Sequence, residues 1–400
     1  MKAVVLAAGE GSRMRPLTSS RPKVMIPVAN RPILEHLLVE MKKAGIKEFI
    51  IVVGYHDEQI RDYFTDGSPW GISIEYCRQG RRQGTADALK MVSGLTEGKF
   101  LLVNGDNVIG RRDIERVMAN DGHTMSVVEV EDPVGLGVVE VSGGKVLRIH
   151  EKVEHPPSRM VNAGLYHLGS DIFRALSRTV KSRRGEYELT DSLQLLIDCG
   201  EAIRYEEIGF WLNLSYPWDL LAANQLLLAD MECYNEGKLE ENVAIKGKVS
   251  IGRDTVIRSG TYIDGPAIIG ENCDIGPNCH IRPFAAIGDG CHIGNASEVK
   301  ASIIMNGTMV PHHNYVGDSV IGSNCNLGSG AKIANLRLDK GNIRVDGIDT
   351  GRRKLGAIIG DGVEVGINAS INTGTIIGND ARIAPGAVVC GVVRPGARIS

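Results

Sequence analysis

A six-residue period governs the second part of the chain. Every sixth position from residue 245 to residue 299 carries Ile or Val. These positions are Ile245, Ile251, Ile257, Ile263, Ile269, Ile275, Ile281, Ile287, Ile293 and Val299, and glycine follows several of them. An unbroken series of this length does not arise by chance, and a hexapeptide period is typical of a parallel β-helix. The period predicts a left-handed β-helix over residues 242–400, with branched side chains stacked inward and small residues at the corners.

The period is interrupted at two places. Val299 and Tyr315 are sixteen residues apart instead of eighteen, which predicts a change of phase with the period resuming at Tyr315. Ile333 and Ile359 are twenty-six residues apart, so residues 335–356 are expected to leave the coil as a loop. Interruptions in a solenoid can aim side chains away from the stack. Both interruptions are rich in polar residues, and we expect them to carry function.

A different pattern occupies residues 1–225, ahead of an expected linker at 226–241. Predicted strands cover 4–6, 48–53, 72–77, 100–103, 124–131 and 138–149, and predicted helices cover 33–44, 86–92 and 219–228. This alternation predicts a Rossmann-like α/β domain with an open, mostly parallel sheet and helices on both faces. Ligands of such sheets bind beyond the carboxyl ends of the strands.

The loop after the first predicted strand carries almost no side-chain bulk. It reads Leu6-Ala7-Ala8-Gly9-Glu10-Gly11-Ser12-Arg13-Met14, and Pro22-Lys23 follows shortly afterwards. Small residues let backbone N–H groups approach an anion closely, and Arg13, Arg15 and Lys23 add positive charge. The third glycine of a dinucleotide fingerprint and the Gly-Lys-Ser/Thr of a Walker A loop are both missing. The loop therefore predicts a different kind of polyphosphate site.

Asp106 follows the strand predicted at 100–103, within Val103-Asn104-Gly105-Asp106. A carboxylate at this edge can hold Mg²⁺ beside a nucleotide phosphate. Position alone also fits an ordinary turn aspartate, but the phosphate loop favours the metal role. Nucleotidyl transfer needs positioning and cations more than covalent help from the protein.

Composition excludes several classes of function. The net charge is −3 and the pI is about 6.4, which argue against a nucleic-acid surface or a basic membrane anchor. The sequence has no apolar run of membrane-spanning length and no signal-peptide layout, so we expect a cytoplasmic protein. Its eight cysteines form no CxxC pair, which argues against structural zinc and a redox motif.

Residues 1–225 resemble the sugar-1-phosphate nucleotidylyltransferases that make UDP-N-acetylglucosamine and dTDP-glucose. The resemblance implies transfer of a nucleotidyl group from UTP or dTTP to a sugar-1-phosphate, with Mg²⁺ and with Arg13 and Lys23 as catalytic residues. Implied nucleotide contacts are Leu6, Ala8, Gly9, Gly11, Ser12, Gln79, Gly84 and Thr85. Implied sugar-phosphate contacts are Glu151, Lys152, Asn162 and Tyr187, and implied metal ligands are Asp106 and Asn213.

Asn213 is a departure from part of that family. Thymidylyltransferase-like members usually carry Trp-x-Asp before Pro-Trp-Asp, whereas this chain has Trp211-Leu212-Asn213 before Pro217-Trp218-Asp219. Asparagine at this place resembles the bifunctional uridylyltransferase/acetyltransferase enzymes and favours UDP-N-acetylglucosamine synthesis. It also removes one negative charge from the metal site.

The first interruption of the period ends in His312-His313-Asn314-Tyr315. A histidine near a substrate amine can act as a general base, although a surface histidine is the plainer interpretation. The order and spacing of Glu298, Lys300, His312, Tyr315 and Asn335 resemble the acetyltransferase domain of the bifunctional enzymes.

This resemblance implies that His312 deprotonates the amine of glucosamine-1-phosphate, with acetyl-CoA as co-substrate. It further implies that Arg282 and Lys300 bind the sugar phosphate, while Tyr315 and Asn335 hold the sugar. The basic segment 337–354 is either a solvated loop or a contact for the phosphates of acetyl-CoA bound by a neighbouring subunit.

We therefore predict a bifunctional enzyme that forms a homotrimer or a dimer of trimers. One alternative is a monofunctional nucleotidylyltransferase whose β-helix serves only oligomerisation or regulation. Another is a non-catalytic scaffold like the related subunits of the eukaryotic translation-initiation exchange factor, which the intact loop around Gly9, Lys23 and Asp106 disfavours. The preferred nucleotide and sugar, and glucosamine versus galactosamine as acetyl acceptor, remain open.

Overall fold

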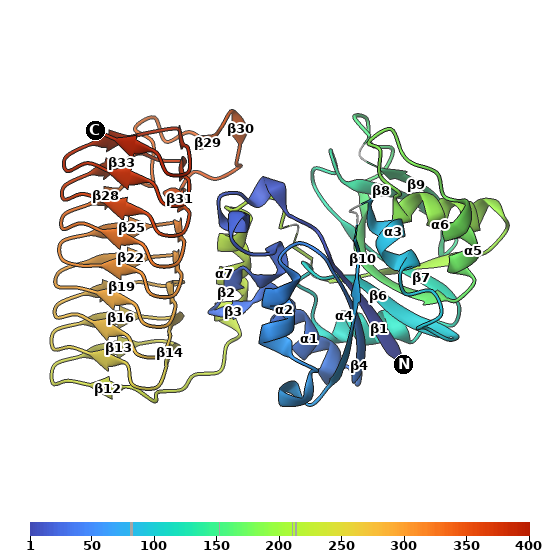
Figure 1. The fold of residues 1–400 in the computed structure, drawn as a ribbon, viewed down its shortest axis with the longest axis horizontal. Coiled ribbons are helices and arrows are strands. Elements are labelled where there is room, and N and C mark those ends of the chain that lie inside the picture. Colours follow the sequence, from blue (N-terminus) through green and yellow to red (C-terminus); the bar gives the residue numbers. More distant parts are fainter. Residues whose placement is uncertain (81–82, 152, 210, 213) are drawn as a thin grey trace. The chain divides into compact units, whose positions relative to one another are not determined.

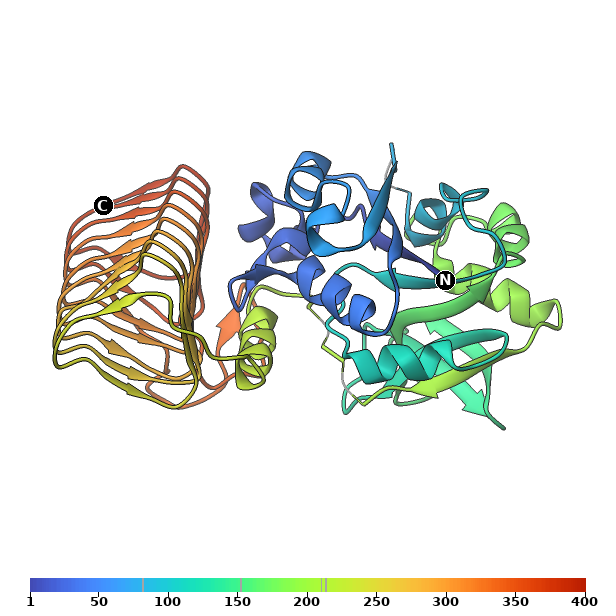
Figure 2. The same ribbon diagram turned by 90° about the horizontal axis from the view of Figure 1, so that it is seen from below.

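The structure is a computed structural model that describes residues 1–80, 83–151, 153–209, 211–212 and 214–400. It contains two compact units (Figures 1 and 2). The first comprises Met1–Glu10, Arg21–Met25 and Ile33–Asn213, and the second comprises Gly11–Ser20, Ile26–Pro32 and Leu214–Ser400. Among the described residues, no helix combines the length and apolar character that crossing a bilayer requires.

One sheet organises the first unit, with the strand order β5-β4-β1-β6-β10-β7-β11-β9-β8. The strands are β1 (Lys2–Ala7), β4 (Glu48–Val53), β5 (Ser73–Arg78), β6 (Lys99–Asn104), β7 (His123–Glu129), β8 (Gly137–Ser142), β9 (Lys145–Glu151), β10 (Met160–Gly169) and β11 (Ile203–Glu207). Strands β5, β4, β1 and β6 are parallel, and β7 is parallel to β11. The antiparallel pairs all involve β8, β9 or β10.

Helices cover both faces of this sheet, which confirms the predicted α/β architecture. They are α1 (Ile33–Lys43), α2 (Asp57–Phe64), α3 (Thr85–Lys90), α4 (Arg111–Met118), α5 (Ile172–Arg178) and α6 (Leu189–Asp198), with short 3₁₀ turns η3 (Lys23–Met25) and η4 (Ser68–Trp70). Helices α1, α2 and α4 pack into one apolar core. Helices α3, α5 and α6 pack into a second core.

The apolar run at 138–149, expected as a strand, folds instead as the hairpin β8–β9. Gly143 and Gly144 have φ angles of +56° and +77°. Residues with a Cβ atom rarely adopt these angles, so the two glycines allow the tight turn that splits the run.

The second unit contains the β-helix, preceded by α7 (Asp219–Ala229), β2 (Pro27–Val28), β3 (Arg31–Pro32) and the turns η1 (Ser12–Met14) and η2 (Leu17–Ser19). Its first sheet consists of β12 (Lys238–Leu239), β15 (Val256–Ile257), β18 (Asp274–Ile275), β21 (His292–Ile293), β24 (Met309–Val310), β27 (Asn326–Leu327), β32 (Glu364–Val365), β35 (Arg382–Ile383) and β38 (Arg398–Ile399). Its second sheet consists of β13 (Ala244–Lys246), β16 (Tyr262–Asp264), β19 (His280–Ile281), β22 (Glu298–Lys300), β25 (Tyr315–Gly317), β28 (Lys332–Ile333), β33 (Ser370–Ile371) and β36 (Val388–Val389). Its third sheet consists of β14 (Val249–Ile251), β17 (Ala267–Ile269), β20 (Ala286–Ile287), β23 (Ile303–Ile304), β26 (Val320–Ile321), β31 (Ala357–Ile359), β34 (Thr375–Ile377) and β37 (Val392–Val393).

Neighbouring strands within each of these sheets are parallel, and the branched residues of the hexapeptide period stack into one continuous core. The predicted left-handed β-helix is therefore confirmed (Figure 1).

The predicted phase at the first interruption is wrong, because Val316 and not Tyr315 faces the core. Val316 is fully buried and belongs to the core, whereas Tyr315 is only half-buried. The inward series runs without a gap through Val299, Ile304, Val310 and Val316. The corners at 299–304 and 316–321 are each one residue shorter than the six-residue rule requires, so the strands still stack in register.

The second interruption leaves the coil as predicted. Strand β26 pairs directly with β31, while the intervening segment forms a small antiparallel hairpin of β29 (Arg344–Val345) and β30 (Ile348–Asp349). Ile343 and Val345 are buried and anchor this hairpin. The excursion is therefore an ordered element, not a structureless loop.

Candidate active sites

A predicted catalytic residue and a predicted metal ligand lie together near the carboxyl ends of β1 and β6. Lys23, in η3, forms an ion pair with Asp106, which follows β6. The two side chains are 17% and 33% exposed, so both remain open to a ligand. This pairing places a cation and a hard oxygen donor at the edge where open α/β sheets bind their ligands.

Backbone contacts hold the start of the phosphate loop against its neighbours. The Gly105 N–H donates to the Leu6 carbonyl at 2.9 Å, and a Cβ added at Gly105 would lie 3.0 Å from that oxygen. By contrast, a Cβ at Gly9 would meet nothing within 4 Å. The space beside Gly9 can therefore admit a ligand close to the backbone.

The rest of this loop belongs to the second unit. Gly11 has a φ of +66°, and its carbonyl accepts hydrogen bonds from Met14 N–H and Thr18 Oγ1 at 2.8 and 2.9 Å. The Arg13 guanidinium lies over the Tyr216 ring, 5.7 Å from its centroid. A cation–π contact of this kind orients the guanidinium without neutralising its charge.

The predicted base-reading and sugar-side segments are joined to each other. Tyr187 accepts a hydrogen bond from Ala86 N–H at 2.9 Å and donates its own N–H to Gln83 at 2.6 Å. The hydroxyl of Thr85 accepts from Leu189 N–H at 3.0 Å, at the start of α6. The Gly84-Thr85 turn and Tyr187 therefore form one structural unit.

Gln79 is buried and serves this turn directly. Its side-chain NH₂ group donates to Asp87 at 2.7 Å and to the Gly84 carbonyl at 3.3 Å. The amide thus braces the loop, so a nucleotide base would meet it only through the remaining carbonyl oxygen.

Glu151 and Asn162 lie at the sugar-side end of the sheet. Glu151 accepts from Thr190 Oγ1 at 3.2 Å, and Arg184 lies 3.8 Å from its other oxygen. Asn162 donates to the Tyr166 hydroxyl at 2.6 Å and accepts from Gly164 N–H at 3.0 Å. Lys152 and Asn213 lie outside the described residues.

Two asparagines in this region were not predicted. Asn107 is buried and donates to the carbonyls of Ala163 and Gly164. A Cβ at Gly164, whose φ is +75°, would lie 2.5 Å from Asn104 Nδ2. Their place within two residues of Asp106 in the sequence was the available signal.

The predicted acetyltransferase residues gather on the second sheet of the β-helix. Arg282 pairs with Glu298 at 2.7 Å, and Lys300 pairs with Asp318 at 2.9 Å. Asn335 donates to the Tyr315 hydroxyl at 3.1 Å and to Asp318 at 2.6 Å. Five predicted residues therefore lie on successive coils together with Asp318, which sequence reasoning missed.

His312 lies at the exposed corner before β25. Its hydrogen bonds within the described residues use its carbonyl oxygen, which accepts from Gly330 N–H at 3.0 Å and Ser329 Oγ at 3.3 Å. The ring lies 6.3 Å from that of His313. The described contacts do not link the His312 ring to Tyr315 or Asn335.

Two arginines of the hairpin excursion, residues 335–356, have partners within the excursion itself. Arg337 pairs with Asp339 at 2.5 Å, and Arg344 donates to the Gly347 carbonyl. Burial lowers the pKa of Arg352, and its Nε finds no acceptor among the described residues.

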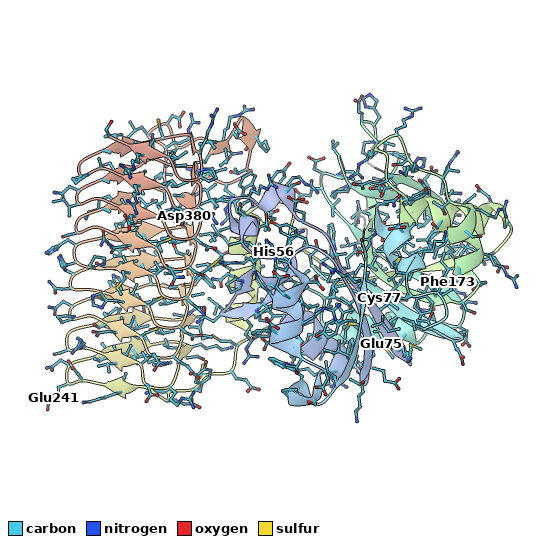
Figure 3. The ribbon with its side chains drawn as sticks, in the orientation of Figure 1. His56, Glu75, Cys77, Phe173, Glu241 and Asp380 are labelled. Atoms are coloured by element: carbon cyan, nitrogen blue, oxygen red, sulfur yellow. The ribbon has the colours of Figure 1, made fainter. Side chains whose placement is uncertain are left out.

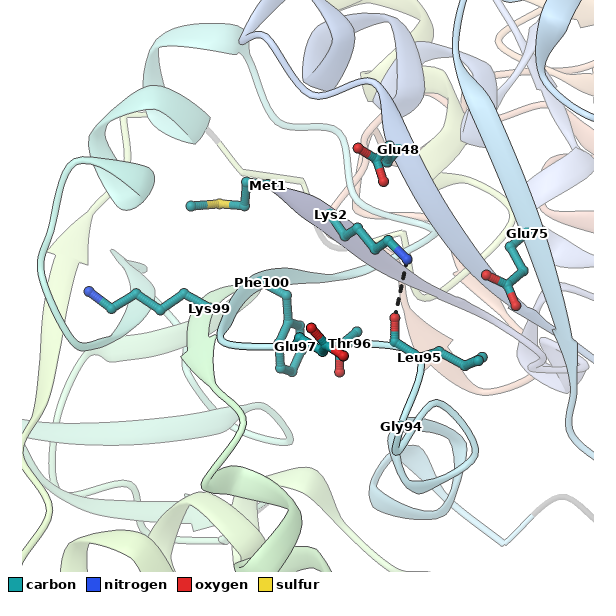
Figure 4. A pocket seen from close by; sticks show the side chains of 10 residues that line it. All are labelled: Met1, Lys2, Glu48, Glu75, Gly94, Leu95, Thr96, Glu97, Lys99 and Phe100. Carbon is teal, nitrogen blue, oxygen red and sulfur yellow. Dashed lines mark hydrogen bonds between the residues drawn. The ribbon is translucent and has the colours of Figure 1, made fainter.

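A pocket of about 440 Å³ lies at the opposite end of the first unit's sheet (Figure 4). Lys2, Glu48 and Lys99, which begin β1, β4 and β6, line it together with Glu75. Because these residues mark the amino ends of the parallel strands, the pocket is separate from the predicted nucleotide site.

Comparison with known proteins covers nearly the whole chain. The family model for nucleotidyl transferase matches residues 2–230, one for the GMPPB C-terminal domain matches 263–347, and one for the bacterial transferase hexapeptide matches 356–391. The Bifunctional protein GlmU of Methanocaldococcus jannaschii is 38% identical, over 97% of this chain and 95% of its own length. The bifunctional sugar-1-phosphate nucleotidylyltransferase/acetyltransferase of Sulfurisphaera tokodaii is 39% identical, over 97% of both chains.

A solved structure matches more than half of the chain. A putative glucose-1-phosphate thymidylyltransferase from Bacillus anthracis, in complex with sucrose, has a TM-score of 0.53 at 27% identity. The match covers 58% of this chain and 97% of that one.

Proposed function

Because the chain belongs to the family of bifunctional sugar-1-phosphate nucleotidylyltransferases/acetyltransferases, we propose that its two activities serve the synthesis of an activated amino sugar. The α/β unit couples N-acetylglucosamine-1-phosphate or glucose-1-phosphate to UTP or dTTP. The β-helix acetylates glucosamine-1-phosphate or galactosamine-1-phosphate with acetyl-CoA. The observation that carries this proposal is the cluster of Arg282, Lys300, Tyr315 and Asn335, because an oligomerisation module has no need of it.

In nucleotidyl transfer, a phosphate oxygen of the sugar phosphate attacks the α-phosphorus and pyrophosphate leaves. Lys23 and Arg13 supply positive charge for the transferring and departing phosphates. The described residues contain no cluster of three His, Cys, Asp or Glu side chains suited to a metal. Asp106 alone still fits Mg²⁺, which usually takes one or two carboxylates and completes its shell with waters and substrate phosphates. When bound, Mg²⁺ would neutralise phosphate charge beside Asp106.

In acetyl transfer, the amine nitrogen attacks the thioester carbonyl, the C–S bond breaks and the thiol of coenzyme A leaves. His312 takes the amine proton as the general base. Arg282 and Lys300 hold the sugar phosphate, and Tyr315 and Asn335 hold the sugar. Glu298 keeps Arg282 in place through their ion pair.

Membership of this family also supports a proposal for the oligomeric state and the cellular location of the protein. We expect a homotrimer or a dimer of trimers, which light scattering would distinguish. All eight cysteines are free, which supports a reducing location such as the cytoplasm.

The test is thiol release from acetyl-CoA with glucosamine-1-phosphate and, in parallel, galactosamine-1-phosphate, followed by pyrophosphate release from UTP and dTTP. Thiol release with either sugar supports two activities and identifies the acceptor. Pyrophosphate release without thiol release would leave the β-helix without the proposed acetyl acceptor.

A further inference from the structure

Asp318 occupies an unusual place in the β-helix. It lies in the shortened corner at 316–321, is only 5% exposed and has a φ of +50°. Its backbone N–H donates to the Lys300 carbonyl at 2.9 Å, and its carbonyl accepts from Gly356 N–H at 2.8 Å. Asp318 therefore contacts the coil below it and the end of the hairpin excursion.

One oxygen of the Asp318 carboxylate serves two substrate-binding candidates at once. Oδ2 accepts from Lys300 Nζ at 2.9 Å and from Asn335 Nδ2 at 2.6 Å. A carboxylate accepts hydrogen bonds and does not donate them, so it requires Asn335 to turn its NH₂ group inward. The same NH₂ group also donates to the Tyr315 hydroxyl at 3.1 Å.

This arrangement determines what the site offers a substrate. Because the Tyr315 oxygen already accepts from Asn335, its O–H remains available as a donor. Burial, Glu298 and Asp318 raise the pKa of Tyr315, so the hydroxyl keeps its proton. The carbonyl oxygen of Asn335 is the acceptor left beside it, which gives a donor and an acceptor in adjacent positions.

Gly317 makes room for the pair. A Cβ at this position would lie 2.6 Å from the Tyr315 hydroxyl and 2.7 Å from Asn335 Nδ2. Any larger residue would push both groups apart.

We infer that Asp318 is a positioning residue for acetyl transfer, which orients the Asn335 amide and the Lys300 ammonium toward the amino-sugar phosphate. The inference rests on the proposed function, because that function makes Lys300, Tyr315 and Asn335 substrate contacts. The chemical partner is a sugar phosphate that presents one donor and one acceptor to Asn335 and Tyr315.

The test compares Asp318→Ala with Asp318→Asn and with the matched control Asp380→Ala. Asp380, labelled in Figure 3, is an exposed corner aspartate with a φ of +59°, so its replacement incurs a similar backbone cost away from the cluster. Steady-state acetyl transfer is measured against both substrates, with the circular dichroism spectrum and thermal unfolding of each variant as the check on folding.

Asp318→Ala should lower kcat/KM for the amino-sugar phosphate by about 10- to 100-fold, with the KM for acetyl-CoA unchanged. Asp318→Asn should recover most of this loss, because Lys300 has only donors and forces the new amide to present its oxygen. Gly317→Ala should reproduce the defect with Asp318 intact. In an Asn335→Ala background, Asp318→Ala should cost much less than in the wild type.

A wild-type kcat/KM in Asp318→Ala would overturn this inference but leave the proposed function standing. An equal loss in the Asp380→Ala control, or strictly additive losses with Asn335→Ala, would also overturn it, because both outcomes point to a general effect on the coil. Absence of thiol release by the wild-type protein would instead overturn the proposed acetyl acceptor, and this inference with it.

Discussion

Gly84 joins the base-side turn to the sugar-side segment, and its replacement by alanine tests that connection. An alanine Cβ there would lie 2.4 Å from the Tyr187 carbonyl oxygen and 2.8 Å from its nitrogen. Both are backbone atoms, so no side-chain rotation relieves the clash. The residue also has φ +106° and ψ 178°, a region that is essentially restricted to glycine.

The expected cost follows from these contacts. The backbone conformation alone costs about 1–3 kcal/mol for a residue with a Cβ. Moving Tyr187 away also weakens its hydrogen bonds with Ala86 and Gln83, at about 1 kcal/mol each. These terms sum to about 3–5 kcal/mol, which corresponds to about a 100- to 5,000-fold loss of kcat/KM in nucleotidyl transfer if the active geometry bears the whole cost.

The assay is pyrophosphate release from UTP or dTTP, with thiol release from acetyl-CoA as the internal reference. Gly84→Ala should lose the first activity and retain the second. Gly80→Ala is the matched control, because a Cβ at Gly80 meets nothing within 4 Å. Nucleotidyl transfer by Gly84→Ala within about threefold of wild type, well inside 1 kcal/mol, would refute the reasoning.

Four other predictions follow from the same structure. Lys23→Ala should lower nucleotidyl transfer by orders of magnitude and spare acetyl transfer, whereas parallel loss of both would contradict two separate sites. His312→Ala should do the reverse, and unchanged acetylation would move the general base elsewhere. Val316→Ala should lower the urea midpoint, because it removes buried methyl groups at a cost of about 1–3 kcal/mol. Tyr315→Phe should impair acetylation and leave the urea midpoint unchanged. A larger loss of stability in Tyr315→Phe than in Val316→Ala would indicate that Tyr315 is the core residue. A thiol reagent should label the exposed Cys199, Cys233 and Cys390 in the native protein. The buried cysteines at 273, 279, 291 and 325 should react only after unfolding, because burial raises their pKa values, to about 12 for Cys291. Rapid labelling of these four in the native protein would contradict this prediction.

The hexapeptide period predicted the β-helix because each inward position is read locally, one residue at a time. The phase error at Tyr315 arose because a corner can lose one residue without disturbing the strands it joins. Tyrosine and valine are both plausible as inward residues, so only the stacking of β25 on β22 distinguishes them. The single strand predicted at 138–149 fails for a related reason, since the apolar pattern does not show that Gly143 and Gly144 adopt positive φ angles and turn the chain back.

In the candidate sites too, local sequence patterns predict the individual residues but not their partners. The predicted residues Lys23 and Asp106 lie together, as do Lys300, Tyr315 and Asn335. Their partners depended on contacts between coils and loops that no local pattern encodes. Asp318 reads as a turn aspartate, and its hydrogen bonds with Lys300 and Asn335 exist only once three coils are stacked.

The shortened corners have a consequence for how a β-helix can carry a substrate-binding surface. Losing one residue at 299–304 and another at 316–321 leaves every strand paired as before. Tyr315 keeps the ordinary outward position, stacked between Glu298 and Lys332, while the shortened corner at 316–321 carries Asp318 beside Lys300. In a stacked solenoid, a corner can therefore lose a residue and present a new polar group while the strands on either side keep their pairing.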